Sequence, residues 1–241
     1  MKRCTITALI ILLGAAAIPA QITTFHRPDF DEIGSIVNSK DKPYYYPKLM
    51  DRYLSNDTTL SPDEFYLLYY GYFFQEGYNA FGSASAYNDS VKALYRKDDF
   101  SDADRRLLLR YTEQLLSSNP FNLKCVNRMY RLYHDLGDTV MSGKYLFKLE
   151  MIAKTLFSTG DGKTDSTGIH VLAINDEYAV LSLLGYEFGG TQSLTSRPCD
   201  YLTVKENSDG LSGMYFDVTQ LFVGYKKLLA PTLPDEAKPG R

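Results

Sequence analysis

The chain has 241 residues, with 26 Lys and Arg against 29 Asp and Glu, which gives a formal net charge of −3 at pH 7. This mildly acidic balance, with both signs interspersed, argues against nucleic acid or an anionic membrane surface as a partner. A chain of this length can bury a substantial core. The chain has 20 Tyr, 13 Phe and no Trp. Tyrosines at this density suit helix surfaces on which the ring packs against apolar groups and the hydroxyl contacts water.

Residues 1–20 have the pattern of a secretory signal peptide. Lys2 and Arg3 precede an uncharged run that ends in Ile18-Pro19-Ala20. A basic start, an apolar stretch of about 7–15 residues and a small residue at the cut are typical of such signals. The run is shorter than the about 20 apolar residues that span a membrane. We therefore expect cleavage after Ala20, export to the periplasm or the exterior, and no membrane span in the mature chain.

The next two segments are predicted to be helical. In the N-terminal segment, 21–45, the apolar spacing from Asp29 to Val37 favours a short helix. Residues 46–158 read as a region of helical hairpins, and Ser61 and Glu64 form a capping box before an almost wholly apolar helix over 65–74. A Gly-, Ala- and Ser-rich loop follows over 75–85. Further helices are predicted over 47–54, 89–97, 101–116, 121–134 and 138–157.

Residues 121–157 resemble a tetratricopeptide helical hairpin. Tyr133 lies in the first helix, Gly137 and Asp138 lie at the turn, and the small Ser142 and Gly143 stand near the start of the second helix. The alanine that such repeats carry late in the second helix is replaced by a larger residue near Leu149. A generic helical hairpin is the alternative interpretation, and either form predicts antiparallel packing.

The composition changes after Phe157, because residues 158–168 contain no hydrophobic side chain. Beyond this boundary we expect a small α+β unit over 169–230. Its predicted strands are 169–174, 199–204 and 214–218, its helices are 176–185 and 219–229, and 189–193 is a turn. A Pro- and charge-rich tail over 231–241 is expected to be disordered. The predicted fold is mainly α, with antiparallel helical hairpins and a C-terminal α+β unit of about three short strands.

Several blocks of the sequence together resemble a family of secreted Gram-negative bacterial proteins that is defined as a domain of unknown function. The blocks are Tyr46 to Leu54, Asp57 to Phe65, Leu68 to Tyr72, Ile169-His170-Val171 with Glu177-Tyr178, and Cys199-Asp200-Tyr201. The similarity covers about residues 45–228. It implies an exported protein, and it supplies no catalytic residues.

The chemistry of a possible active site centres on His170. The sequence has no nucleophile elbow, P-loop, zinc spacing or dinucleotide fingerprint, so we expect no cofactor and no metal ion. His170 alternates with apolar neighbours on a predicted strand, and Glu177, Cys199 and Asp200 are the residues expected near it. A Cys199–His170 pair would lower the thiol pKa and create a thiolate nucleophile. The favoured interpretation is a structural histidine that hydrogen-bonds a loop carbonyl.

Two cysteines, Cys125 and Cys199, remain after removal of the signal peptide. An exported compartment permits a disulfide, but neither cysteine has a close partner in sequence. Two buried free thiols are therefore favoured, and a Cys125–Cys199 bridge is the alternative.

Two functions compete on these observations. The first is a non-enzymatic exported module that binds another envelope or secreted protein, or gives structure to an envelope assembly, with Tyr66, Tyr69, Tyr70 and Tyr72 as the aromatic binding residues. The second is a hydrolase with a site around His170 and Cys199, or around the carboxylates of Glu177 and Asp200. An enzyme needs its nucleophile and base within about 3 Å of each other beside a cleft, whereas a binding module needs only a groove.

Overall fold

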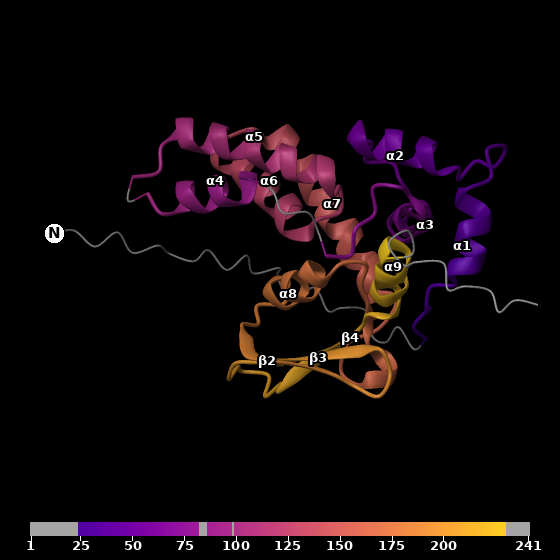
Figure 1. Ribbon diagram of the computed structural model, residues 1–241. Helices are drawn as coiled ribbons and strands as arrows, with labels where there is room; N and C mark the ends of the chain where they lie inside the picture. The colour runs from indigo at the N-terminus through magenta and orange to yellow at the C-terminus, as the bar shows by residue number, and fades with distance from the viewer. Residues whose placement is uncertain (1–23, 82–85, 98, 230–241) are drawn as a thin grey trace, which may run out of the picture.

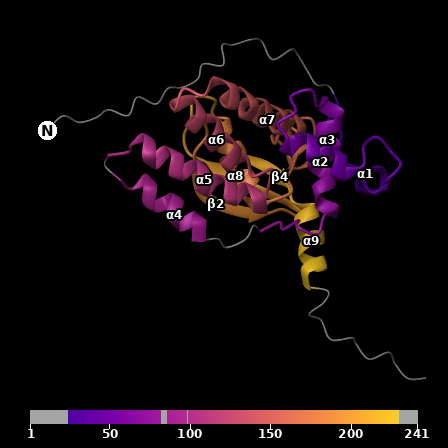
Figure 2. The ribbon, with the colours of Figure 1, turned by 90° about the horizontal axis from the view of Figure 1, so that it is seen from above.

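A computed structural model describes residues 24–81, 86–97 and 99–229. The predicted signal peptide and the predicted disordered tail lie outside these residues, as does part of the loop over 75–85. Nine α-helices and one four-stranded sheet occur in the described part. Figure 1 shows the helices as a layer on one side of the sheet, and the view from above in Figure 2 shows the sheet beneath them. The fold is therefore mainly α with a small C-terminal α+β part, as the sequence predicts.

The helices follow the chain with short connections. Three-residue 3₁₀ turns lie at Tyr72–Phe74 and Asp165–Thr167. The helices are α1 (Phe30–Val37), α2 (Tyr46–Leu54), α3 (Pro62–Gly71), α4 (Ala86–Tyr95), α5 (Asp102–Ser118), α6 (Leu123–Asp135), α7 (Thr139–Phe157), α8 (Ile174–Leu183) and α9 (Thr219–Leu229).

Helix starts agree with the capping residues in the sequence. The predicted capping box is present at α3, where the Glu64 backbone N–H donates to Ser61 Oγ at 3.2 Å and the Ser61 N–H donates to Glu64 Oε2 at 2.8 Å. Side chains of Asp29, Ser101, Asn122 and Asp138 cap α1, α5, α6 and α7 by accepting from a backbone N–H of the first turn, and at α5 the bond is reciprocal. These caps satisfy N–H groups that have no partner within the helix.

The sheet has the strand order β1-β4-β3-β2. Its strands are β1 (Ile169–His170), β2 (Phe188–Leu194), β3 (Cys199–Val204) and β4 (Gly213–Asp217). β1 runs parallel to β4, and the other two pairs are antiparallel.

Two predicted elements of this part are wrong. The strand predicted over 169–174 ends at His170, because Ala173 is already the N-cap of α8. An apolar run of this kind is buried equally well in a strand or in a helix start. The predicted turn over 189–193 lies within β2, an edge strand whose residues are mostly exposed. Gly189 lies so close to Thr203 that a Cβ would be 2.7 Å from its hydroxyl, and Gly190 has φ +100°. The glycines are therefore used for close packing and a bulge within a strand.

One hydrophobic core joins the helices to the sheet. α3 is at its centre, with Phe65, Leu68 and Tyr70 fully buried, and α3 packs against α1, α2 and α7. The same cluster continues through Ile169 and Phe216 of the sheet. A smaller cluster lies between α4, α5 and α6. The polar segment 158–168 thus separates an all-helical region from a mixed region of helices and sheet, and both regions share the main core.

Both described cysteines, Cys125 and Cys199, are buried free thiols, which confirms the favoured interpretation over a disulfide. No helix in the described ranges is long and apolar enough to cross a membrane.

Candidate functional site

The sheet brings three chemically interesting side chains into one row. Asp217 of β4 is in register with His170 of β1 on one side and with Cys199 of β3 on the other. Residues paired across neighbouring strands project to the same face. Two strand spacings, about 9.6 Å, therefore separate His170 from Cys199 along this row. The predicted Cys199–His170 pair is not formed, because Asp217 lies between its members.

Arg27 covers the histidine end of this row. Its Nε–H donates to His170 Nε2 at 3.2 Å, and its NH2 group forms an ion pair with Asp217 Oδ2. His170 Nε2 and Asp217 Oδ2 lie 3.4 Å apart, with side chains that are 10% and 8% exposed. Since Nε2 accepts from Arg27, it is the unprotonated nitrogen of the ring. The partner of His170 is thus a guanidinium and not the loop carbonyl that we expect from the sequence.

Electrostatics keep His170 neutral. Burial lowers the pKa of His170 to about 4, Asp217 opposes this shift, and the Arg27 charge adds to it. Burial raises the pKa of Asp217, but His170, the hydrogen bonds from Thr219 and the charge of Arg27 outweigh it and hold that pKa below its usual value. A histidine whose lone pair accepts from arginine is poorly placed to act as a general base.

Cys199 is also unsuited to nucleophilic attack. Its Sγ lies 3.6 Å from the carbonyl oxygen of Asp165, and Gly168 lies against the same sulfur. Burial, followed by the interaction with Asp165 and the charge of Asp217, raises the pKa of Cys199 to about 12. The group is a protonated thiol at neutral pH, whereas a catalytic cysteine needs a lowered pKa.

Glu177 and Asp200, the other two predicted catalytic residues, lie on the opposite face of the sheet. Gln192 Nε2 donates to Asp200 Oδ2 and lies 3.5 Å from Glu177 Oε2, so the amide bridges the two carboxyl groups. Tyr178 completes this cluster by donating to Gln192 Oε1 at 2.6 Å. Asp200 pairs in register with Phe216, whose ring faces the core, which places this cluster away from His170 and Cys199.

Burial dominates the chemistry of this carboxyl pair. Glu177 is fully buried, and burial together with the charges of Asp200 and Asp176 raises its pKa to about 9. The neighbouring Asp176 accepts from Tyr69, and burial raises its pKa to about 7. Neither of the two described cavities has Glu177 or Asp200 in its lining. Glu177 is therefore protonated and enclosed at neutral pH, whereas Asp200 is half-buried, and burial raises its pKa against the hydrogen bond from Gln192.

The structure places three of the four predicted binding tyrosines in the core. Tyr69 donates to Asp176 Oδ2, Tyr70 donates to the His170 carbonyl oxygen and Tyr72 donates to the Gly77 carbonyl oxygen, at 2.9–3.0 Å. They are buried because neighbouring elements enclose α3 on most sides. Only Tyr66 remains half-buried and lines a cavity.

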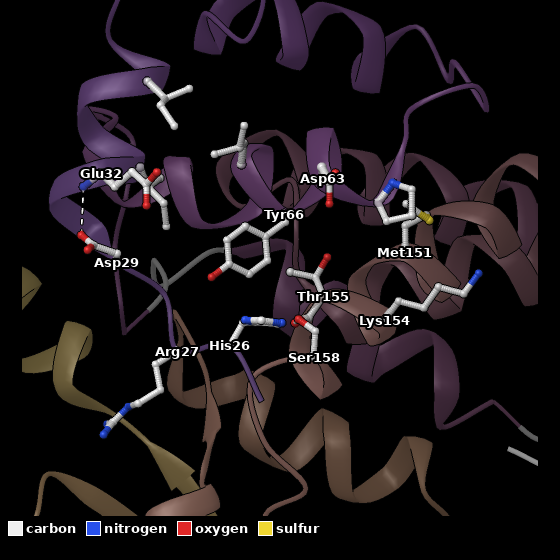
Figure 3. A pocket seen from close by; sticks show the side chains of 14 residues that line it. His26, Arg27, Asp29, Glu32, Asp63, Tyr66, Met151, Lys154, Thr155 and Ser158 are labelled. Atoms are coloured by element: carbon white, nitrogen blue, oxygen red, sulfur yellow. Dashed lines mark hydrogen bonds between the residues drawn. The ribbon is translucent and has the colours of Figure 1, made fainter. Parts of the chain in front are cut away.

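This cavity, of about 490 Å³, lies between α1, the start of α3 and the end of α7, and we call it the α1–α3–α7 groove. Figure 3 shows the Tyr66 ring in the middle of the groove, with Thr155 and Ser158 below it and Asp63 near its upper end. Apolar side chains of Ile33, Ile36, Leu67 and Met151 line it together with the carboxylates Asp29, Glu32 and Asp63 and the basic groups His26, Arg27 and Lys154.

Arg27 and Asp217 both contact His170, and the sequence does not predict either of them as a site residue. Arg27 precedes the first helix by three positions, and nothing local relates it to His170, which is 143 residues away. Asp217 lies within the strand predicted over 214–218, so its position in the same sheet as His170 is a possible signal. The alternation of apolar residues identifies strands, but it does not show that the strands of His170 and Asp217 are neighbours in the sheet.

Removal of the Arg27 side chain is expected to raise the pKa of His170 above about 4, while burial, the largest cause of the lowered pKa, keeps it below that of an exposed imidazole. Arg27→Ala removes a repelling charge and frees Nε2 to take up a proton beside Asp217. NMR titration of the three histidine Cε1–H signals measures this shift, and His26 and His134 serve as internal references. A pKa that stays near 4 in the variant contradicts the role given to Arg27.

The described residues contain no group of three His, Cys, Asp or Glu side chains arranged to hold a metal ion. No curated protein and no solved structure matches the chain. A family model described as "Domain of unknown function (DUF4919)" matches residues 31–227. Since this match covers most of the chain, the protein belongs to the DUF4919 family, a domain of unknown function.

Proposed function

We propose that this protein is a non-enzymatic, exported interaction module that binds a segment of another envelope or secreted protein in the α1–α3–α7 groove. The observation that carries the proposal is the position of Tyr66. It is the one member of the predicted tyrosine set that lines a cavity, and it lies over apolar side chains of three helices. Tyrosine in such a position is typical of the anchor residues of protein interfaces.

The charges around the groove support a polypeptide as the ligand. Glu32 of α1, Asp63 of α3 and Lys154 of α7 all line the groove. Burial, followed by the charges of Asp29 and Glu32, raises the pKa of Tyr66 to about 12, so its hydroxyl stays a donor at neutral pH. A segment with an apolar side chain flanked by both charge signs complements this surface.

A hydrolase with a site around His170 and Cys199 is the alternative, and the geometry favours it less. Asp217 separates the two residues, the imidazole nitrogen is occupied by Arg27, and the thiol is protonated. The carboxyl pair of Glu177 and Asp200 lines neither described cavity.

The proposal includes the tetratricopeptide-like character of α6 and α7 and export by the predicted signal peptide. Gly137 has φ +78° at the turn, Asp138 caps α7, and Tyr133 stacks on Tyr145 at 5.6 Å. These features support the resemblance, although Gly143 has no close neighbour and only Ser142 is buried near the helix start.

Selection of a randomised peptide library on the mature chain tests this function. We expect enrichment of peptides that share an apolar anchor. Tyr66→Ala should weaken the enriched peptides at least about fivefold, because truncation of an interface anchor costs more than about 1 kcal/mol. Lys154→Glu should change the charge preference of the selected peptides.

Lys48→Glu on α2 is the matched control, since Lys48 is exposed and lies outside the groove. It should bind the wild-type peptides unchanged. Selection that yields no shared anchor, or peptides that bind Tyr66→Ala as well as wild type, contradicts the proposal. A hydrolytic activity that is lost in His170→Ala would favour the alternative.

A further inference from the structure

A second groove, separate from the first, lies between α4, the first turns of α6 and the length of α8. It has a volume of about 710 Å³, and we call it the α4–α6–α8 groove. Figure 1 shows α4 at the opposite end of the molecule from α1, with α8 nearer the middle. Its charged lining side chains are Lys92, Lys124 and Arg128, and its described lining contains no Asp or Glu. The chain has a net charge of −3, whereas the charged side chains that line this groove are all positive.

Arg128 is the central cation of the groove, and it is half-buried. Its NH1 group lies 3.5 Å from Thr112 Oγ1 and 3.8 Å from Cys125 Sγ, and its guanidinium lies 5.8 Å from the centre of the Tyr95 ring. The structure pairs neither Arg128 nor Lys124 with a carboxylate within the described residues. Lys92 differs, since it lies 3.3 Å from Asp89 at the surface.

A half-buried guanidinium without an anionic partner is unusual, because partial loss of hydration destabilises a charge that is not paired. The planar fork of arginine matches the geometry of a carboxylate and binds it through two parallel hydrogen bonds. Arg128 and Lys124, one helical turn apart on α6 and both lining the same cavity, therefore suit a ligand with carboxylate groups.

The neutral lining indicates what else this ligand carries. Four asparagines, Asn88, Asn122, Asn127 and Asn175, line the groove. A side-chain amide both donates and accepts, which matches the two-way hydrogen bonding of hydroxyl groups. Asn122 Oδ1 already accepts from the Cys125 N–H as the cap of α6, so its NH2 group is the part that faces a ligand as a donor. The Tyr95 ring stacks parallel to the Phe100 ring with 6.0 Å between ring centres, and its exposed part, 56% of the residue, offers an apolar surface at the rim.

We propose that the α4–α6–α8 groove binds an acidic oligosaccharide, a chain of sugar rings that carry carboxylates. Arg128 and Lys124 bind the carboxylates, the asparagine amides bind ring hydroxyls, and Tyr95 contacts the apolar face of a sugar ring. The volume of the groove falls within the range of about 300–1,000 Å³ that is typical of small-ligand sites. An acidic peptide satisfies the cations equally well, but it offers fewer hydroxyls to the four amides.

Isothermal titration calorimetry of the mature chain with a trisaccharide of galacturonic acid tests this proposal. We expect binding at low salt that weakens as salt is added. The neutral trisaccharide of galactose should bind at least about tenfold more weakly, because it lacks the charge-assisted hydrogen bonds. Arg128→Gln should weaken binding of the acidic trisaccharide to a similar extent, and Lys124→Gln should do so to a smaller extent.

Arg131→Gln is the matched control, because Arg131 is exposed on the same helix and does not line the groove. It should bind as wild type does. Circular dichroism of each variant verifies that it is folded, and the exposed Lys124 keeps the test decisive if Arg128→Gln unfolds. Equal affinity for the acidic and neutral trisaccharides overturns the proposal. So does unchanged binding by both groove variants, or tighter binding of a triglutamate peptide than of the acidic trisaccharide.

Discussion

Replacement of Glu177 by Gln is expected to stabilise the protein, and the gain should increase with pH. Glu177 is fully buried, and its pKa is raised to about 9, first by burial and then by Asp200 and Asp176. The unfolded chain has an ordinary glutamate with a pKa near 4.5. Between these two pH values the folded state holds a proton that the unfolded state has lost.

The sign of the pH dependence follows from this difference. Stability falls wherever the folded state binds more protons than the unfolded state. Wild-type stability should therefore be unaffected by Glu177 below about pH 4.5 and should fall by about 1.4 kcal/mol per pH unit above it, until about pH 9. Glutamine does not titrate, so Glu177→Gln should be more stable than wild type by about 3 kcal/mol at pH 7.

Urea unfolding of wild type and Glu177→Gln at pH 5, 7 and 8.5 measures this effect. Asp200→Asn is the comparison variant, because Asp200 is only half-buried and accepts from Gln192. It should show a weaker pH dependence of the stability difference. Parallel stability curves for wild type and Glu177→Gln over this pH range would show that Glu177 is ionised in the folded protein.

Truncation of Phe216 is expected to destabilise the helices and the sheet together. Phe216 is fully buried on β4 and belongs to the cluster that also contains Phe65 and Leu68 of α3. Loss of a buried phenylalanine side chain costs about 3–5 kcal/mol, because apolar contacts are lost and a cavity remains. Since the two regions share this core, Phe216→Ala should lower the stability of the whole described fold in one transition.

Urea unfolding followed by far-ultraviolet circular dichroism and by tyrosine fluorescence tests this prediction. The two signals should coincide in wild type and in Phe216→Ala, with the midpoint of the variant shifted to lower urea. Val140→Ala, at a side chain that is 66% exposed on α7, should change stability by less than about 0.5 kcal/mol. Two separate transitions would show that residues 46–158 and 169–230 are independent units.

Local sequence signals predict most of the helices. The capping box at Ser61 and Glu64 and the caps at Ser101 and Asp138 locate helix starts, because these side chains satisfy specific N–H groups. The helix predicted over 219–229 is present with the same bounds. β2 was missed because an exposed edge strand with Gly189 and Gly190 lacks an apolar alternation.

The candidate site was less predictable, because long-range pairing decides it. The sequence indicates that His170 faces away from Ile169, and the structure agrees. The sequence does not give the order of the strands in the sheet, so it does not predict that Asp217 lies between His170 and Cys199. Tyr66 and Tyr70 are separated by one helical turn, yet neighbouring elements bury Tyr70 and leave Tyr66 at a cavity.

We propose the α1–α3–α7 groove as the site at which another protein binds. The most direct test of this claim is photo-crosslinking from position 66, with p-benzoylphenylalanine in place of Tyr66, in the cells that produce the protein. Tyr44, which is 38% exposed and outside the groove, gives the matched control position. We predict one protein adduct from position 66 that is absent from position 44. Identical adducts from both positions, or none from position 66, would contradict the claim.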